Sequence, residues 1–259
     1  MTVMLDIGGT LHPMVSDDTY LESHGGVFEP DTVKLLRTLA RGTVYDVGAN
    51  VGCTALLFAA AAERVHAFEP SPSTFRYLVE NTAACRNVIA HNVGLAERKR
   101  RSEITFAAAN RSGGFVSDLT QACEGHVTEA IELRKMDAYC KKLPPPDFIK
   151  IDVEGFELNV LAGAPRILRK YRPVVTLEMN HWCLNAFRRT SIPEFMDRLR
   201  AIFPKLYAVQ GDEYLDLHDA AQSYKAMYHH ILSMKFASIV GAFNDEQLAP
   251  FHAGYRRVP

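Results

Sequence analysis

The sequence has no excess of charge of either sign. Its 259 residues include 29 lysines and arginines against 30 aspartates and glutamates, a formal net charge of −1. Because proteins hold nucleic acids largely through basic side chains that neutralise phosphates, this balance argues against a nucleic-acid partner. Long apolar runs are missing too. The longest, residues 55–62, is far too short to cross a bilayer, so we expect no integral membrane segment.

Cysteines are few, and their spacing forms no metal or disulfide motif. There are five, an odd number, and no two form a C-x-x-C pair. This pattern argues against a disulfide framework or a zinc cluster and predicts reduced thiols. The first ten residues are too short and too acidic for a signal peptide, so we expect a cytoplasmic protein. The oligomeric state is left open.

Predicted strands alternate with predicted helices from residue 43 onward. Strands are predicted at 43–47, 65–68, 88–93, 148–153 and 174–179, and helices at 53–62, 73–85, 157–170 and 192–202. This alternation predicts an α/β fold with a doubly wound, mainly parallel sheet covered on both faces. Residues 1–41 are predicted as an N-terminal extension, irregular up to residue 30, with a helix capped by Asp31. Residues 42–259 are predicted as one domain.

The most informative segment joins the first strand of this domain to the helix at 53–62. The strand runs into Asp46, Gly48, Asn50 and Gly52, an Asp-x-Gly-x-Asn-x-Gly pattern. Glycines let the backbone turn sharply and approach a ligand, and the helix behind them offers free N–H groups. The pattern predicts a nucleotide-type ligand at the carboxyl end of the strand. The simpler alternative is a tight strand–helix turn.

Two further strand ends carry polar residues suited to the same ligand. Glu69 ends the second strand, where a carboxylate can accept hydrogen bonds from both ribose hydroxyls. Its alternative role is to cap the next helix. Asn92 ends the third strand, where it, or the backbone beside it, could bind an adenine edge. The alternative for Asn92 is a turn residue.

Charged residues gather on the segment 148–157. Lys150, Asp152 and Glu154 alternate, so a strand there would point all three to one face. Three charges on one face of a central strand are costly unless they are paired or functional. The alternative is that Lys150 merely neutralises one neighbouring acid.

These motifs, in this order, resemble the FkbM family of methyltransferases. The resemblance rests on Asp-Val-Gly-Ala-Asn-Val-Gly, Phe-Glu-Pro, Asn-Val-Gly-Leu and Lys-Ile-Asp-Val-Glu-Gly-Phe-Glu, and it spans about residues 20–210. It implies a Rossmann-like class I methyltransferase fold with a reversed final hairpin, and S-adenosylmethionine as methyl donor. The donor contacts implied or predicted are Glu29, Asp46, Gly48, Asn50, Gly52, Glu69, Ser71, Asn92 and Asp152.

The same resemblance implies O-methylation, here of a hydroxyl on a sugar, glycan or natural-product acceptor. His181 follows the fifth strand and is our predicted base, because its unperturbed pKa lies near neutrality. Asp152 and Glu154 are the other predicted catalytic residues. The alternative for His181 is a structural loop histidine. Carboxyl or N-methylation, or a donor-binding module that serves a partner without catalysis, are the alternative functions.

A magnesium ion is conceivable at the same edge of the sheet. Asp152, Glu154, Glu178 and Asn180 all offer oxygen ligands. The sequence does not favour a metal over a set of metal-free carboxylates, so no metal ligand is assigned.

Overall fold

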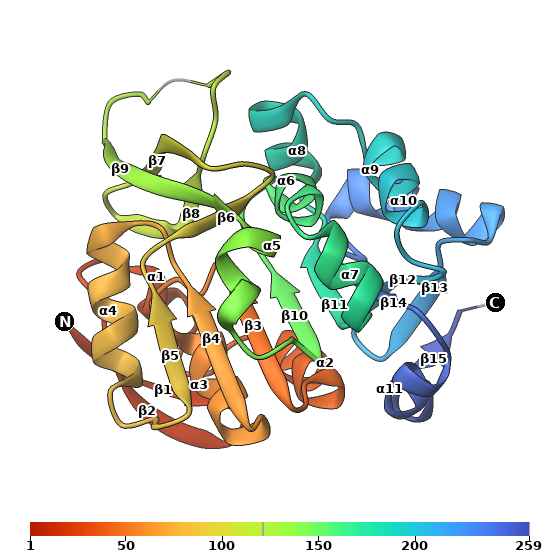
Figure 1. The fold of residues 1–259 in the computed structure, drawn as a ribbon, viewed down its shortest axis with the longest axis horizontal. Coiled ribbons are helices and arrows are strands. Elements are labelled where there is room, and N and C mark those ends of the chain that lie inside the picture. Colours follow the sequence, from red (N-terminus) through yellow and green to blue (C-terminus); the bar gives the residue numbers. More distant parts are fainter. Residues whose placement is uncertain (121, 259) are drawn as a thin grey trace.

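The computed structural model describes residues 1–120 and 122–258. Its centre is a nine-stranded sheet with helices on both faces (Figure 1). The strand order is β15-β13-β12-β14-β11-β10-β3-β4-β5. The strands are β3 (Thr43–Val47), β4 (Arg64–Phe68), β5 (Val88–His91), β10 (Phe148–Ile151), β11 (Val174–Glu178), β12 (Lys205–Gln210), β13 (Glu213–Asp216), β14 (Ser238–Ala242) and β15 (Arg256–Arg257).

Strands β11, β10, β3, β4 and β5 pair with one another in parallel, which confirms the predicted doubly wound, mainly parallel sheet. β14 lies between β11 and β12 and is antiparallel to both. It is the expected reversed strand, although the two-residue β15 follows it. Strands β3, β10 and β11 are almost wholly buried. Burial on both faces explains why most of their residues are apolar, with Asp46, Lys150 and Thr176 as the buried polar exceptions.

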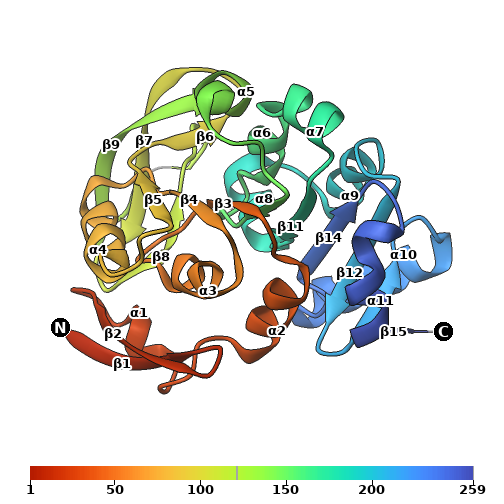
Figure 2. The same ribbon diagram turned by 60° about the horizontal axis from the view of Figure 1, so that its bottom comes forward.

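Helices flank this sheet on both sides (Figure 2). They are α1 (Tyr20–Ser23), α2 (Pro30–Leu39), α3 (Cys53–Ala61), α4 (Pro72–Thr82), α5 (Met136–Tyr139), α6 (Glu157–Ala162), α7 (Pro165–Tyr171), α8 (His181–Arg188), α9 (Ile192–Arg200), α10 (Ala220–Ser233) and α11 (Ala249–Gly254). Two short 3-10 helices, η1 (Cys140–Lys142) and η2 (Glu246–Leu248), complete the set.

Two helix predictions need correction, and one helix was missed. The helix expected over 157–170 is two helices, because Pro165 lacks the N–H that a continuous helix would need there. Helix α2 begins at Pro30 with Glu29 as its N-cap residue, so Asp31 lies in its first turn and is not the cap. Helix α8 was not predicted. It places His181 on a helix and not in a loop.

The first 30 residues are not irregular as predicted. They form a hairpin of β1 (Thr2–Ile7) and β2 (Thr10–Val15), followed by α1. Gly8 and Gly9 make its two-residue turn at φ 64° and 86°, a left-handed conformation that favours glycine. Leu5 and Met14 are fully buried in the same core as Leu57 of α3. The hairpin is therefore an integral part of the packing around α3.

A second, four-stranded sheet stands above the carboxyl ends of β4 and β5 (Figure 1). Its order is β6 (Gly94–Ala96), β9 (His126–Lys135), β7 (Arg100–Ala107), β8 (Asn110–Phe115). β7 and β8 pair antiparallel as a hairpin. Residues 107–130 contribute β8 and the start of β9.

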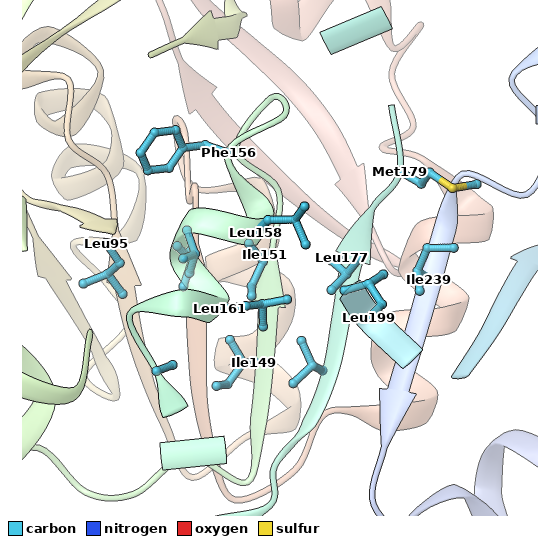
Figure 3. Close-up of a cluster of buried hydrophobic side chains, with 14 of the residues drawn as sticks. Leu95, Ile149, Ile151, Phe156, Leu158, Leu161, Leu177, Met179, Leu199 and Ile239 are labelled. Carbon is cyan, nitrogen blue, oxygen red and sulfur yellow. The ribbon is translucent and has the colours of Figure 1, made fainter. Parts of the chain in front are cut away.

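The main core lies between the sheet and the helices α6, α7 and α9 (Figure 3). Ile149 and Ile151 of β10 and Leu177 of β11 face Leu158 of α6 and Leu199 of α9. These five side chains are at most 8% exposed. Packing of this density holds the ends of β10 and β11 rigidly, and the candidate site is built on those ends.

Candidate active site

A cavity of about 350 Å³ opens at the carboxyl ends of β3, β4, β10 and β11. In open α/β sheets this edge is where ligands bind, because the strand-to-helix loops there leave a crevice. The second sheet contributes Phe106 and Arg111 to the cavity wall, and the N-terminal segment contributes Tyr20 and Glu29. Seven predicted site residues line it: Glu29, Gly48, Asn50, Glu69, Ser71, Asp152 and Glu154. The other four, Asp46, Gly52, Asn92 and His181, do not.

The glycine loop is shaped by neighbouring backbone more than by a ligand. Gly48 has φ 80°, and a Cβ there would lie 1.8 Å from the carbonyl oxygen of Asp152. Gly52 has φ 105°, and a Cβ there would lie 3.2 Å from side-chain atoms of Leu78 and Thr82. Our expectation that both glycines lie against a ligand is corrected for Gly52, which packs against α4 and not against the cavity.

Asp46 lies beneath the cavity floor, fully buried. Its carboxylate accepts a hydrogen bond from the Thr54 hydroxyl at 2.7 Å, and Lys150 Nζ lies 3.4 Å away. Asp46 does not line the cavity, and its carboxylate contacts Thr54 and Lys150, so the structure favours a supporting role and the direct donor contact stays a prediction.

Lys150 joins the two halves of the site. Its Nζ donates to the Gly48 carbonyl at 2.8 Å and lies 3.4 Å from both Asp46 and Asp152. Burial opposes the charged form, but the carboxylates of Asp152 and Asp46 outweigh burial and raise the pKa of Lys150. The lysine thus neutralises two acids instead of one, and it ties β10 to the glycine loop.

Glu69 is the buried acid on the β4 side, with 6% of its surface exposed. Its carboxylate accepts backbone N–H bonds from Asn50 at 3.1 Å and from Ser71 at 2.9 Å. Burial raises the pKa of Glu69 to about 7. These two bonds leave lone pairs free on both oxygens, so the carboxylate can still accept hydrogen bonds from a ribose.

Ser71 and Asn92 hold the loop around Glu69. Ser71 caps α4, and its hydroxyl donates to Glu129 at 2.6 Å. The Asn92 amide donates to the carbonyl oxygens of Glu69 and Pro70, both at 3.0 Å. Because that amide nitrogen already binds the loop, the structure favours a supporting role for Asn92, and its adenine contact stays a prediction. The cavity wall there consists of residues 93–95, which agrees with the backbone alternative.

The opposite side of the cavity is strongly acidic. Carboxylate oxygens of Asp152, Glu154 and Glu178 lie within 4.8 Å of one another. Asp152 contacts Lys150, and Glu154 accepts a hydrogen bond from the Cys183 thiol at 3.1 Å. Glu178 has no side-chain hydrogen bond or ion pair within residues 1–120 and 122–258. Burial raises the pKa of Glu154 to about 7, and burial together with Asp152 and Glu154 raises the pKa of Glu178 well above its ordinary value.

The backbone that carries these acids differs from the prediction. β10 ends at Ile151, so Asp152 and Glu154 lie in the turn after the strand and not on one strand face. Glu154 has φ 52°. Gly155 follows at φ 88°, with the Cys183 backbone 2.9 Å from where a Cβ would lie. This tight turn against α8 aims Glu154 into the cavity.

His181 occupies the first turn of α8, outside the cavity wall. Its ring lies edge-on to His230, with 5.1 Å between ring centroids. The side chain of Asn180 caps the helix by accepting the Cys183 N–H at 3.2 Å. Asn180 is therefore engaged locally, which argues against it as a metal ligand. The assignment of His181 as base stays a prediction.

Two residues of the site were missed by the sequence interpretation. Thr176 lies two positions before Glu178 on β11, lines the cavity and is 4% exposed. Its hydroxyl has no partner among the described residues. The period of a strand could have revealed it. Arg111 donates to Ser73 and Thr74, each at 3.0 Å, and pairs with Asp17. No local pattern predicts Arg111, because its partners come from distant segments.

Comparisons with known proteins identify the family. The methyltransferase FkbM domain matches residues 46–213. The chain is 32% identical over 152 residues to the hexuronic acid methyltransferase AglP of Haloferax volcanii, covering 57% of this chain and 61% of that one. It is 26% identical over 151 residues to the 2-O-methyltransferase NoeI of Sinorhizobium fredii, covering 51% and 61%. The chain thus spans about three fifths of the length of these relatives.

Among solved structures, the methyltransferase FkbM of Methylobacillus flagellatus is similar. Its TM-score is 0.43 at 21% identity, with 63% of this chain and 38% of that chain covered. Separately, no helix within the described residues is long and apolar enough to cross a membrane.

Proposed function

Because the chain belongs to the FkbM family of methyltransferases, we propose that it transfers the methyl group of S-adenosylmethionine to a hydroxyl of a sugar, glycan or related small molecule. The observation that carries the proposal is the division of one cavity into two ends. A buried glutamate beside a glycine loop forms one end, and hydroxyl and carboxylate side chains form the other.

The residues at the first end fit the donor. Glu69 offers carboxylate oxygens to the ribose hydroxyls, and the backbone of 93–95 borders the space for an adenine ring. Asn50 Oδ1 is buried without a hydrogen-bond partner among the described residues, and it lines the cavity. An orphaned buried acceptor of this kind is costly unless a ligand satisfies it. Asp152 also lines the cavity, and its carboxylate can pair with the amino group of the methionine part.

S-adenosylmethionine supplies an electrophilic methyl group on a positively charged sulfur. As the acceptor oxygen forms its bond to the methyl carbon, the carbon–sulfur bond breaks and leaves a neutral thioether. The acceptor hydroxyl loses its proton. The chain's task is alignment, since in-line attack depends on holding two reactants at short range. Lys150, through Gly48 and Asp152, keeps the donor loop and the acidic turn in register.

A hydroxyl acceptor is supported over a carboxylate by the charges around the second end. The carboxylates of Asp152, Glu154 and Glu178 would repel an anionic acceptor group. The two relatives are named for a hexuronic acid and for 2-O-methylation, which supports a sugar-like acceptor, and the second name supports a hydroxyl as the methylated group. An amine acceptor on the same scaffold is the second outcome that the experiment below distinguishes.

The test has two stages. Calorimetric titration with S-adenosylmethionine and S-adenosylhomocysteine measures donor binding without any acceptor. A screen of glycosides, amines and carboxylic acids with a methyl-labelled donor then identifies the acceptor class. Base treatment of the product separates a methyl ether, which survives, from a methyl ester, which hydrolyses. Absence of donor binding would refute the proposal. Binding without transfer to any acceptor class would favour the non-catalytic alternative.

A further inference from the structure

The sheet order divides the cavity between donor and acceptor. Glu69 lies at the end of β4, the glycine loop at the end of β3, and Asp152 at the end of β10. Beyond β10 come β11 and β14. If the donor extends from β4 to β10, as the proposed function requires, only the part of the cavity bordered by β11 and β14 remains for the acceptor. The inference below rests on that proposed function.

Two polar side chains in this part have no partner within the described ranges. Thr176 and Glu178 alternate on β11, so their side chains leave the same face of the strand, roughly 7 Å apart along it. The Thr176 hydroxyl is buried, at 4% exposure, without a hydrogen bond. Buried polar groups normally have partners. Two unsatisfied groups on one strand face of a cavity point to a ligand that satisfies both.

The remaining charges define what that ligand can be. Glu29, Asp152 and Glu154 join Glu178 on the cavity wall, so four carboxylates face this end. The only cation that lines this part of the described cavity is Lys150, and it is already held by Asp46, Asp152 and the Gly48 carbonyl. Arg111 lines the cavity on the side of the second sheet and is bound there to Asp17. Within the described residues, no cation near β11 is left to pair with an acceptor's negative charge.

We propose that this end binds an uncharged, hydroxyl-bearing ring and rejects a uronate at the methylated position. Glu178, in its ionised form, accepts a hydrogen bond from the hydroxyl that is methylated. Thr176 donates to a neighbouring oxygen of the same ring. As the oxygen–methyl bond forms and the carbon–sulfur bond breaks, the hydroxyl proton leaves along its hydrogen bond to Glu178. A carboxylate in the same place would face these four acids without a counter-charge.

The experiment compares two matched methyl glycosides, a neutral hexopyranoside and the corresponding uronic acid. Saturation-transfer NMR on the complex with S-adenosylhomocysteine measures acceptor binding, and labelled methyl transfer measures kcat/KM. The variants are Thr176→Val and Glu178→Gln, which keep side-chain shape. The controls are Thr105→Val, a buried threonine on β7 outside the cavity, and Glu63→Gln, an exposed glutamate.

We expect the wild type to bind and methylate the neutral glycoside at least ~10-fold better than the uronic acid. Glu178→Gln should lower kcat/KM for the neutral glycoside by roughly 10²-fold or more, and Thr176→Val by roughly 10-fold, since each leaves a polar group of the complex unpaired. Glu178→Gln should also reduce the preference of the enzyme for the neutral glycoside over the uronic acid. The control variants should change neither quantity, and donor affinity should stay constant throughout.

Preferential binding of the uronic acid by the wild type would overturn this inference, as would neither glycoside binding to the complex. So would unchanged kcat/KM and unchanged acceptor preference in both cavity variants. All of these outcomes leave donor binding intact, so they are distinct from failure of the proposed function, which loss of donor binding would show. Stronger binding of a matched amino sugar than of the neutral glycoside would also refute the uncharged-ring assignment.

Discussion

The carbonyl oxygen of Asp152 lies where a side chain on Gly48 would have to begin. A Cβ at Gly48 would be 1.8 Å from that oxygen, and the residue also has φ 80°. The two constraints are separable, because Gly9 has φ 86° and a Cβ there would meet nothing within 4 Å. Position 48 therefore needs glycine both for its backbone angle and for its close contact with the acidic turn. Position 9 needs glycine for its backbone angle alone.

We expect Gly48→Ala to destabilise the protein by several kcal/mol, against about 1 kcal/mol for Gly9→Ala, which carries only the left-handed backbone cost. Gly48→Ala should also lose donor binding, because the acidic turn must move away. Thermal unfolding and calorimetric titration of both variants measure this difference. Equal destabilisation by Gly48→Ala and Gly9→Ala would show that the turn at Asp152 moves away at little cost in free energy.

Replacing Glu69 tests the donor end. We expect Glu69→Ala to weaken binding of S-adenosylmethionine by roughly 1–3 kcal/mol, the usual effect of losing a hydrogen bond to a charged group. Glu63→Gln, on the exposed end of the same βα unit, is the control. Unchanged affinity for the donor in Glu69→Ala would remove the ribose assignment.

Buried carboxyl groups predict how stability depends on pH. Glu157 is buried, its carboxylate accepts N–H bonds from Val153 and Gly155, and burial raises its pKa to about 8. Between the unfolded value near 4.5 and about 8, the folded protein keeps a proton that the unfolded chain releases. The contribution of Glu157 to the free energy of unfolding therefore falls as pH rises through this window, by up to roughly 1.4 kcal/mol per pH unit.

We expect Glu157→Gln to remove this slope, so that the variant gains stability relative to wild type between pH 5 and 8. The measured quantity is the difference in free energy of unfolding between variant and wild type, because His66 contributes to both. Burial lowers the pKa of His66 to about 4, so its contribution to stability rises with pH up to about pH 6.5, opposite to that of Glu157. Denaturant unfolding at four pH values is sufficient. A difference that does not vary with pH would contradict the assignment.

Two residues, Glu178 and His181, are the candidates for the group that accepts the proton of the acceptor hydroxyl, and mutation can distinguish them. Glu178 lines the cavity and His181 does not, so we expect Glu178→Gln to lower turnover by roughly 10²–10⁴-fold, the usual contribution of a general base. His181→Ala should lower it far less, and donor affinity should be kept in both. A loss of that size in His181→Ala, with Glu178→Gln nearly active, would assign the base to His181 as the sequence predicts.

The contacts of the three clustered carboxylates predict that activity does not depend on a metal. Three carboxylates close enough for a cation are present, but Lys150 contacts Asp152, and the Cys183 thiol donates to Glu154. We therefore expect full activity after exhaustive chelation. Loss of turnover that Mg²⁺ restores would instead show that a cation displaces these partners.

The sequence by itself determined the alternation of strands and helices and the position of the glycine loop. It also placed Glu69 at a strand end. These features depend on local periodicity and on turn chemistry, which a short window of sequence contains. The same locality explains the missed hairpin at residues 1–15. Its stability comes from packing against α3, which no window around the hairpin records.

Only the tertiary structure decided which polar residues face the cavity. Asp46 and Asn92 belong to the motifs, yet one is covered by Lys150 and Thr54, and the other binds the loop carbonyls. Thr176 belongs to no motif, yet it borders the cavity without a partner among the described residues. The reason is physical. Whether a polar group is free for a ligand depends on its neighbours in space, and here those neighbours come from segments as far apart as Lys150 and Gly48, 102 positions along the chain.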